Sequence, residues 1–358
     1  MKKPIEDFFV SKTTSIQEAM RCIDNNAKGI ALIVNDKRRL IATITDGDIR
    51  RAILDGLSLN LPLEKLLERK PASSYPNPVT APTSADSGEL LKIMREKSIR
   101  QIPVIDENKR VVDLITLADL VPQESLPLQA VLMAGGFGSR LRPFTEDLPK
   151  PMLPVGDRPI IEHTIEQLKF AGIRNVSITT HYQADKITDH FGDGQSFGVN
   201  IDYIPEANPL GTAGALSLLQ DIDEPLLVIN GDILTKVDFR AMHNFHAEHG
   251  ADLTVGVHLY DFKIPYGVIE SNGSQVLNIQ EKPELQFLVS AGIYLLEPSV
   301  RRYIPKNERF DMPNLIRRVI HEGGRVVNFP VVEYWLDIGQ QSDYEKAQDD
   351  LKDGGFKK

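Results

Sequence analysis

The sequence predicts an α/β protein with a mainly parallel sheet, preceded by a smaller α+β repeat. After residue 128, continuous apolar runs that end in Gly, Asp or His alternate with helical stretches such as 160–172. Such runs are typical of strands buried on both faces of a sheet. Before residue 121, one pattern of apolar runs ending in Thr-x-x-Asp occurs twice. The 41% hydrophobic and 25% charged residues are typical of a globular chain, and 358 residues predict two or three domains.

The first element in chain order is the repeat, at residues 30–51 and 102–120. Each copy contains an apolar run, a polar turn with Lys-Arg, a second apolar run and Ile-Thr-x-x-Asp before a helix. Thr45 of the first copy corresponds to Thr116 of the second, 71 residues later. The prolines of residues 71–83 predict an extended linker between the copies. Thr and Asp at such a strand-to-helix turn can cap the helix, so the pattern does not by itself require a ligand.

Because it recurs, this signature resembles a tandem pair of CBS domains, at residues 1–65 and 66–121. The resemblance implies that an adenine nucleotide binds between the copies through its ribose. Ala42 and Asp113 replace the glycine that usually precedes the signature, and Asp113 adds negative charge near a phosphate site. Helix capping, or a scaffold for dimerisation, remains the alternative role. The residues implied for ribose binding are Thr45, Asp48, Thr116 and Asp119.

After a Pro-containing linker at 122–128, the first strand of the α/β half leads into a glycine-rich loop. Residues 134–140 read Ala-Gly-Gly-Phe-Gly-Ser-Arg. Such a loop lets backbone N–H groups approach a triphosphate closely. Leu141 at the third glycine position argues against a dinucleotide-binding G-x-G-x-x-G loop, and the Walker A and kinase signatures are missing. Arg140 and Lys150 add a guanidinium and an ammonium group for phosphate oxygens.

Together with Lys-Pro-Met at 150–152, this loop resembles the signature of the sugar-1-phosphate nucleotidyltransferases, G-G-x-G-[ST]-R followed by K-P-[ML]. The resemblance covers residues 129–350 and leaves 351–358 as a tail. It implies a Rossmann-like, GT-A-like domain that joins a nucleoside triphosphate to a sugar 1-phosphate and releases pyrophosphate. The residues implied for catalysis are Arg140, Lys150 and Asp232. The residues implied for nucleotide binding are Ala134, Gly135, Gly136, Gly138, Glu206, Gly211 and Thr212.

Two aspartates stand at the ends of apolar strands in this half. Asp232 ends the run 225–232, and Asp337 follows an aromatic strand. Two carboxylates from separate strands can hold Mg²⁺, which prefers oxygen ligands and bridges phosphates. The resemblance implies that Asp232 and Asp337 are this metal pair, whereas either aspartate alone is also compatible with a helix cap. No covalent nucleophile is needed, so catalysis consists of positioning and charge stabilisation.

The segment 205–216 resembles the loop that reads the base in this family, with Gly211 contacting the base through its backbone. Glu206 then meets the base edge. Guanine presents two N–H donors side by side, which a carboxylate accepts in parallel. Uracil and thymine present one N–H between two carbonyl groups, which a carboxylate repels. Glu206 therefore favours GTP over UTP or dTTP, unless its side chain points to solvent and the backbone alone reads the base.

Three short motifs resemble the sugar-binding elements of the family: Tyr-Gly-Val, Glu-Lys-Pro and Ser-Ala-Gly-Ile-Tyr. A serine replaces the usual asparagine of the third motif, and its hydroxyl has a shorter reach and one donor fewer. CBS domains before a guanylyltransferase-like domain resemble a bacterial branch that activates amino sugars for legionaminic acid synthesis. This favours glucosamine 1-phosphate, with mannose or heptose 1-phosphate as alternatives. The residues implied for sugar-phosphate binding are Gly267, Glu281, Lys282 and Ser290.

Composition excludes several other classes of protein. The net charge of −9 argues against nucleic acid and membrane surfaces as partners. A single cysteine, Cys22, excludes an intrachain disulfide framework. With no secretory signal and no apolar run of membrane-spanning length, we expect a cytoplasmic protein. The resemblance to the two families implies a homo-oligomer. The histidines in 243–249 are expected on a surface helix rather than at a metal. A non-catalytic nucleotide sensor and a dehydrogenase remain the alternatives from other classes.

Overall fold

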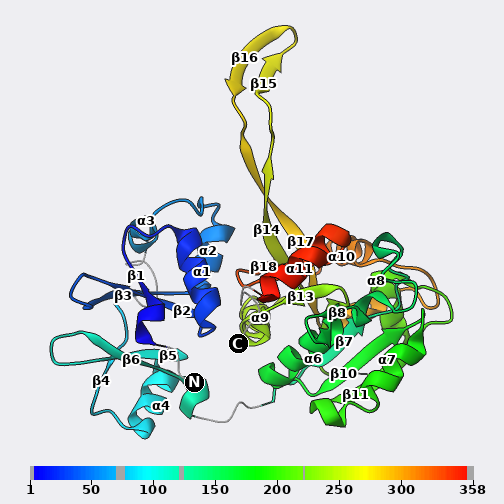
Figure 1. The fold of residues 1–358 in the computed structure, drawn as a ribbon, viewed down its shortest axis with the longest axis horizontal. Coiled ribbons are helices and arrows are strands. Elements are labelled where there is room, and N and C mark those ends of the chain that lie inside the picture. Colours follow the sequence, from blue (N-terminus) through cyan, green and yellow to red (C-terminus); the bar gives the residue numbers. More distant parts are fainter. Residues whose placement is uncertain (1–3, 70–76, 121–124, 221, 353–358) are drawn as a thin grey trace.

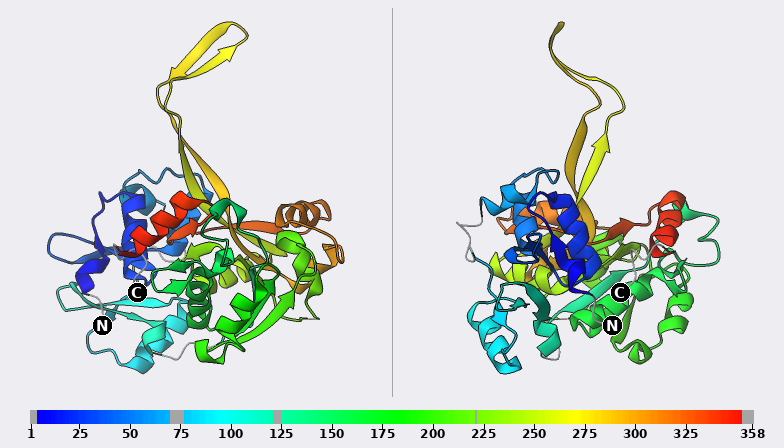
Figure 2. Two further views of the ribbon diagram at one scale, coloured as in Figure 1. Left: turned by 45° about the vertical axis from the view of Figure 1, so that its right-hand side comes forward. Right: turned by 60° about the vertical axis from the view of Figure 1, so that its left-hand side comes forward.

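The computed structural model describes residues 4–69, 77–120, 125–220 and 222–352. Parts of the linkers predicted at 71–83 and 122–128, and most of the tail 351–358, lie outside these residues. Figure 1 shows the repeat as one unit and the α/β half as a second unit beside it. A long two-stranded arm, residues 260–288, projects from the second unit. Two further views show the same arrangement (Figure 2). None of the described helices is long and apolar enough to cross a membrane.

The repeat is confirmed by two three-stranded sheets of identical order, β1-β2-β3 and β4-β5-β6. Both hairpins have a register irregularity at the same point, after Ile33 in the first and after Val104 in the second, 71 residues apart. The copies also share a small core of apolar side chains. The strands are β1 Phe9–Val10, β2 Ile30–Val34, β3 Leu40–Thr45, β4 Ala81–Pro82, β5 Gln101–Ile105 and β6 Val111–Thr116. The helices are η1 Ile5–Phe8, α1 Ile16–Asn26, α2 Asp46–Leu54, α3 Leu63–Leu67, α4 Ser87–Glu96 and α5 Leu117–Leu120.

The α/β half is built on a seven-stranded sheet of order β11-β10-β7-β12-β17-β14-β18. Only β17 runs antiparallel to its neighbours β12 and β14, so the predicted α/β fold with a mainly parallel mixed sheet is confirmed. Three two-stranded pairs, β8-β9, β13-β19 and β15-β16, lie outside this sheet. The strands of the large sheet are β7 Gln129–Met133, β10 Asn175–Thr180, β11 Asn200–Pro205, β12 Leu226–Asn230, β14 Leu253–Lys263, β17 Glu284–Leu296 and β18 Val326–Pro330. The paired outer strands are β8 Pro154–Val155, β9 Arg158–Pro159, β13 Ile233–Thr235, β15 Val268–Asn272, β16 Gln275–Gln280 and β19 Trp335–Asp337.

Helices cover both faces of the large sheet, which is why its strands read as continuous apolar runs. Along β7, Ala130 and Leu132 pack into the core under α6, α7 and α9, while Val131 packs into the core under α8 and α10. Successive side chains of a strand point to opposite faces, so a strand covered on both sides needs no polar alternation. The helices are α6 Ile160–Ala171, α7 Ala184–Phe191, α8 Gly211–Gly214, α9 Phe239–Glu248, α10 Met312–His321 and α11 Gln341–Lys352. The 3₁₀ turns are η3 Ser139–Leu141, η4 Lys150–Met152, η5 Gln195–Phe197, η6 Ala215–Leu218 and η7 Pro298–Tyr303.

The histidine-rich segment forms helix α9, but the prediction that it lies on the surface is wrong for His246. This side chain is buried under the sheet, where its Nδ1 lies 2.7 Å from Thr254 Oγ1 and its Nε2 lies 3.1 Å from Glu297 Oε1. Two hydrogen-bonding partners make burial of the imidazole acceptable. Burial lowers the pKa of His246. No group of three or more metal-binding side chains occurs in the described part of the chain.

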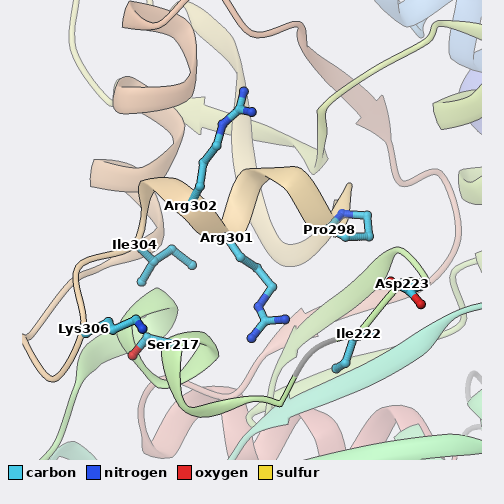
Figure 3. A pocket seen from close by; sticks show the side chains of 8 residues that line it. All are labelled: Ser217, Ile222, Asp223, Pro298, Arg301, Arg302, Ile304 and Lys306. Atoms are coloured by element: carbon cyan, nitrogen blue, oxygen red, sulfur yellow. The ribbon is translucent and has the colours of Figure 1, made fainter.

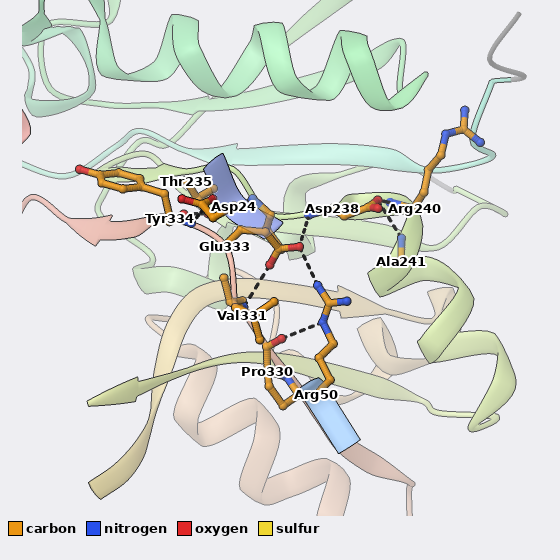
Figure 4. A network of polar contacts seen from close by, with 12 residues as sticks. Asp24, Arg50, Thr235, Asp238, Arg240, Ala241, Pro330, Val331, Glu333 and Tyr334 are labelled. Atoms are coloured by element: carbon orange, nitrogen blue, oxygen red, sulfur yellow. Dashed lines mark hydrogen bonds and ion pairs between the residues drawn. The ribbon is translucent and has the colours of Figure 1, made fainter. Parts of the chain in front are cut away.

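The two units meet through a buried polar network (Figure 4). Arg50 of α2 reaches across the boundary: its Nε donates to Pro330 O at 2.9 Å and its guanidinium pairs with Glu333 at 2.6 Å. The side chains of Arg50 and Glu333 are only 5% and 9% exposed. The same guanidinium lies 4.3 Å from the ring centre of Phe329. Val332 packs into the apolar core of the first repeat copy, so the contact is apolar as well as ionic.

Candidate active site

The glycine loop leaves the sheet at the carboxyl end of β7, between two strands that fix its course. The N–H of Ala134 donates to Thr179 Oγ1 of β10 at 3.1 Å. On the other side, Gly231 N donates to Met133 O at 3.0 Å, directly after β12. Asp232 therefore lies beside the loop. Parallel strands place their carboxyl ends at one edge of a sheet, which is where α/β folds bind ligands.

Two glycines of the loop are required by close contacts. A Cβ on Gly135 would lie 2.5 Å from Glu206 Oε1, so only glycine lets the loop approach this carboxylate. Gly138 has a left-handed backbone with φ of 62°, and a Cβ there would lie 3.0 Å from Cβ of Lys150. Thr145 Oγ1 donates to Gly138 O at 2.9 Å and holds the returning segment against the loop. The loop thus lies against the carboxylate of Glu206 at one end and against the lysine segment at the other.

Lys150 and Asp232 form the centre of the site. Lys150 Nζ lies 2.5 Å from Asp232 Oδ2, and both side chains are largely buried. Asp232 Oδ1 is buried without a hydrogen-bond partner among the described residues. An unsatisfied carboxylate oxygen in a buried position is costly unless it has a partner such as a bound cation. The structure therefore leaves one oxygen of Asp232 for a ligand.

Asp337 lies next to Asp232, because β13 and β19 pair directly after β12. Ile233 faces Asp337 in that pair, and Ile338 N donates to Asp232 O at 3.1 Å. Burial, and then the negative charge of Asp232, raise the pKa of Asp337. The positive charges of Lys150 and Arg140 act on it in the opposite direction. The neighbouring carboxylate of Asp232 thus raises the proton affinity of Asp337, and one oxygen of Asp232 has no partner among the described residues. This arrangement fits a hard divalent cation.

Arg140 is exposed in η3, at the mouth of the glycine loop. Within the described residues it makes no ion pair, although its charge is felt at Asp337. Since the described part of the chain holds no third metal-binding side chain here, a cation at the two aspartates would take its other ligands from substrate oxygens and water. Arg140 would then face the phosphates that the loop holds.

Glu206 is buried, at 7% exposure, and does not point to solvent. Its Oε2 accepts the N–H of Leu210 at 2.8 Å, and its Oε1 is the atom that lies against Gly135. Its backbone carbonyl lies 2.7 Å from His181 Nδ1. The carboxylate is thus fixed in direction by the segment that it belongs to.

The next turn of the segment 205–216 is held by the start of α10. Gly211 has φ of 79°, and a Cβ there would lie 2.4 Å from Asp311 Oδ1. Thr212 N donates to that same oxygen at 3.1 Å, and Thr212 Oγ1 accepts Met312 N at 2.8 Å. No sequence pattern indicated this role for Asp311, because Asp311 lies about a hundred residues after Thr212 and belongs to no motif.

Of the four residues expected to bind the sugar phosphate, only Ser290 is connected to the aspartates, through Tyr294, on which the charge of Asp232 acts. Ser290 Oγ lies 2.9 Å from the hydroxyl oxygen of Tyr294. Burial, opposed by this hydrogen bond and supported by the charge of Asp232, raises the pKa of Tyr294. Gly292 between them lies against Asn230, whose amide nitrogen a Cβ would meet at 2.8 Å. Sequence analysis did not single out Tyr294 or Asn230. Tyr294 belongs to the motif Ser-Ala-Gly-Ile-Tyr and Asn230 precedes Gly231 and Asp232, so these motifs could have indicated both residues.

Gly267, Glu281 and Lys282 are not brought to the aspartates of their own chain. They lie on the outer half of the arm, where all three residues are exposed. They do lie together: a Cβ on Gly267 would be 2.9 Å from Glu281 Oε2, and Lys282 N donates to Tyr266 O. The sequence motifs cannot show this separation, because the strands between them continue outward as a ribbon instead of turning over the site.

The CBS-like residues form helix caps. Thr45 and Asp48 make a capping box at α2, with Asp48 Oδ2 accepting Thr45 N at 2.9 Å. In the second copy, Asp119 Oδ2 accepts Thr116 Oγ1 at 2.6 Å, and its other oxygen pairs with Lys28 at 3.3 Å. The capping role is therefore present without a ligand.

A cavity of about 1510 Å³ lies where the repeat faces the α/β half. Thr116 and Asp119 line it, whereas Thr45 and Asp48 do not. It is large enough for a nucleotide. A smaller pocket of about 500 Å³ lies beside η7 (Figure 3). Its Arg301 donates to the carbonyl groups of Leu219 and Gln220, which gives that arginine a structural role away from the aspartates.

Known proteins were compared with this chain. Residues 129–354 match the family model described as nucleotidyl transferase, and residues 1–55 and 72–123 match the CBS domain model. A mannose-1-phosphate guanyltransferase of Emericella nidulans is 33% identical over 232 residues, covering 61% of this chain and 62% of that protein. A probable mannose-1-phosphate guanylyltransferase 1 of Oryza sativa subsp. japonica is 35% identical over 228 residues, covering 61% and 63%. The match thus spans less than two thirds of these relatives.

Solved structures give the same picture of the fold. A putative glucose-1-phosphate thymidylyltransferase from Bacillus anthracis superimposes with a TM-score of 0.52 at 26% identity, covering 64% of this chain and 98% of that one. HddC from Yersinia pseudotuberculosis, complexed with GMP-PN, gives a TM-score of 0.50 at 25% identity, covering 62% and 99%.

Proposed function

Because the chain belongs to the nucleotidyl transferase family and carries CBS domains, we propose that it transfers a guanylyl group from GTP to a sugar 1-phosphate. The observation that carries this proposal is the cluster of Lys150, Asp232 and Asp337 at the glycine loop. One oxygen of Asp232 is bound by the lysine and the other has no partner among the described residues. A non-catalytic sensor would have no use for this arrangement.

The reaction needs no protein nucleophile. A phosphate oxygen of the sugar phosphate attacks the α-phosphorus of GTP, and the bond from that phosphorus to the β-phosphate oxygen breaks, which gives the GDP-sugar and pyrophosphate. The N–H groups of residues 135–138 hold the phosphates, and Arg140 binds the charge that grows on the departing pyrophosphate. Lys150 stabilises the transferred phosphoryl group. Mg²⁺ held by Asp232 and Asp337 would neutralise charge on the bridging phosphate oxygens.

The base is proposed to be guanine because of how Glu206 is fixed. Its buried carboxylate is oriented by Leu210 N and lies under Gly135, at the end of the loop that holds the phosphates. Guanine can donate N1–H and N2–H to a carboxylate, whereas uracil and thymine would face it with carbonyl oxygens. The similarity to guanyltransferases supports the same base.

Two sugars are supported by different observations. The named relatives act on mannose 1-phosphate, which supports this sugar here. The CBS domains in front of the catalytic unit support glucosamine 1-phosphate instead, and a heptose 1-phosphate is the third candidate. We further propose that an adenine nucleotide binds in the cavity between the units and regulates the transfer.

The test is pyrophosphate release with Mg²⁺, with four nucleoside triphosphates crossed against glucosamine, mannose and heptose 1-phosphates. Release with GTP and one sugar is the expected result, and chelation of the metal should abolish it. Release with UTP or dTTP would keep the reaction class and refute the role of Glu206. If no combination releases pyrophosphate, and none does when ATP, ADP or AMP is added, the proposed reaction is refuted and a nucleotide sensor is favoured.

A further inference from the structure

The arm is an unusual element for a chain on its own. From Tyr260 to Leu288 every residue is exposed except Ile264 and Pro283, which are half-buried. Figures 1 and 2 show it standing clear of both units in all three views. A two-stranded ribbon in water is at best marginally stable, because it buries too little apolar surface. The arm therefore needs something to pack against.

One face of the arm is apolar. Cross-strand partners lie on the same face of a ribbon, and two successive pairs on one face are Tyr260 with Phe287 and Phe262 with Leu285. The pair on the opposite face between them, Asp261 with Gln286, is polar and hydrogen-bonded. At the tip, Ile269 faces Ile279. Eleven large apolar side chains of the arm are exposed, up to 74% for Tyr266. They include chain neighbours such as Phe287 and Leu288, so some of them also lie on the opposite face. A patch of this kind marks a protein–protein contact.

The arm cannot reach the aspartates of its own chain in this geometry. The ladder of β14 and β17 is unbroken from Ser290 to Glu284, and backbone hydrogen bonds from Ile264 and Lys282 continue it outward. Strands rise about 3.4 Å per residue, so Glu284 lies roughly 20 Å out from Ser290. Glu281 and Lys282 lie farther still. A sugar phosphate bound at Asp232 would find no contact with them in the same protomer.

We propose that the arm of one protomer docks on the catalytic unit of a second copy and places Glu281 and Lys282 at the sugar-phosphate side of its site. The occupant is a second copy because the arm carries the very side chains that the site on the unit lacks. Exposed Phe137 and Phe144, in and just after the glycine loop, offer apolar surface for the arm's apolar face. Exchange about a two-fold axis gives two complete sites and is a low-cost route to a dimer.

The docking can be tested without activity. The chain of 40.0 kDa should sediment at about twice that mass. Replacing two arm side chains, Tyr260→Ser with Phe287→Ser, should give monomers, since neither residue supports the fold of the unit. The matched control is Ile320→Ser, an equally exposed apolar residue on α10, which should leave the dimer intact. A monomeric wild type would overturn the proposal.

Cross-linking shows where the arm docks. A photo-crosslinker at Tyr266 in a mixture of isotope-labelled and unlabelled chains should form adducts with residues 134–150 of the other chain. Adducts confined to one chain would show that the arm folds back on its own site, and would overturn the proposal.

The contribution to the partner's site rests on the proposed function and is tested by complementation. Chains with Lys282→Ala and chains with Asp232→Asn should each be inactive. In a mixed dimer, the intact catalytic unit of the Lys282→Ala chain meets the intact arm of the Asp232→Asn chain, which completes one of the two sites. Since about half of the dimers in an equal mixture are mixed, about a quarter of the wild-type activity should return. A mixture of Asp232→Asn with Lys150→Ala is the control and should stay inactive, since both lie on the unit. No recovery in verified mixed dimers would overturn the exchange, whereas an inactive wild type would refute the proposed function instead.

Discussion

Replacing Arg50 with methionine should destabilise the contact between the two units strongly. Methionine fills part of the volume of the arginine but leaves the Pro330 carbonyl without its donor. It also leaves the Glu333 carboxylate buried with the backbone N–H groups of Val332 and Asp238 as its hydrogen-bond donors. Removing one partner of a buried ion pair costs about 3–5 kcal/mol, because the remaining charge stays buried. We expect a loss of this size in the free energy of unfolding.

The assay is urea unfolding followed by the fluorescence of Trp335, the single tryptophan, two residues from Glu333. The matched control is Arg51→Met. Arg51 is the next residue of the same helix, but its side chain is 66% exposed and its pair with Asp48 is on the surface. Exposed pairs contribute about 0–1 kcal/mol, so this variant should be nearly neutral.

A double variant separates the buried charge from the lost packing. Glu333→Gln in the Arg50→Met background removes the uncompensated charge and keeps one acceptor oxygen, which can serve one of the two backbone N–H groups of Val332 and Asp238. It should therefore recover part of the lost stability. If Arg50→Met costs no more than Arg51→Met, the network of Figure 4 does not hold the two units together, and the reasoning is refuted.

Three other predictions follow from the site and the interface. Lys150→Ala or Asp232→Asn should lower turnover at least ~10²-fold, the scale of losing one contact to the transition state, and unchanged steady-state rates in both would refute the assignment of the site. Glu206→Gln keeps an acceptor for Leu210 N but should relax the preference for GTP toward UTP or dTTP, measured as the ratio of kcat/KM values; an unaltered ratio would remove Glu206 as the base reader. Burial, and next the charge of Glu333, raise the pKa of Asp46 to about 7, above the value of about 3.9 in an unfolded chain. Between pH 4 and 7 only the unfolded chain releases this proton, so stability should fall as pH rises through that window, and Asp46→Asn should flatten the fall in urea titrations at several pH values.

Much of the fold could be predicted because its signals are local. Each predicted strand of the α/β half is present, since an apolar run buried on both faces has no other stable place than a covered sheet. The repeat was visible because the same turn and cap chemistry occurs twice, and the structure repeats even the irregularity of the hairpin. The neighbourhood of Asp232 and the glycine loop also follows, because parallel strands bring their carboxyl ends to one edge.

Other features depended on contacts between distant residues. Nothing near His246 in the sequence shows that Thr254 and Glu297 would satisfy its ring in the core. Asp311 holds the turn at Gly211 and Thr212 from a position that belongs to no sequence motif. Nor does any sequence pattern show that Arg50 would pair with Glu333, because the two residues are 283 positions apart.

The sequence by itself determined the α/β class and the tandem repeat, because periodicity and turn chemistry are local properties. A shared site for Lys150, Asp232 and Asp337 was implied only by the resemblance to a family. Only the tertiary structure decided how the repeat joins the α/β unit and where the motifs expected to bind the sugar phosphate lie. A strand pattern states which side chains share a face, but not whether the ribbon turns over its own site or projects away. That choice depends on long-range packing, and it is what separates Lys282 from Asp232 within one protomer.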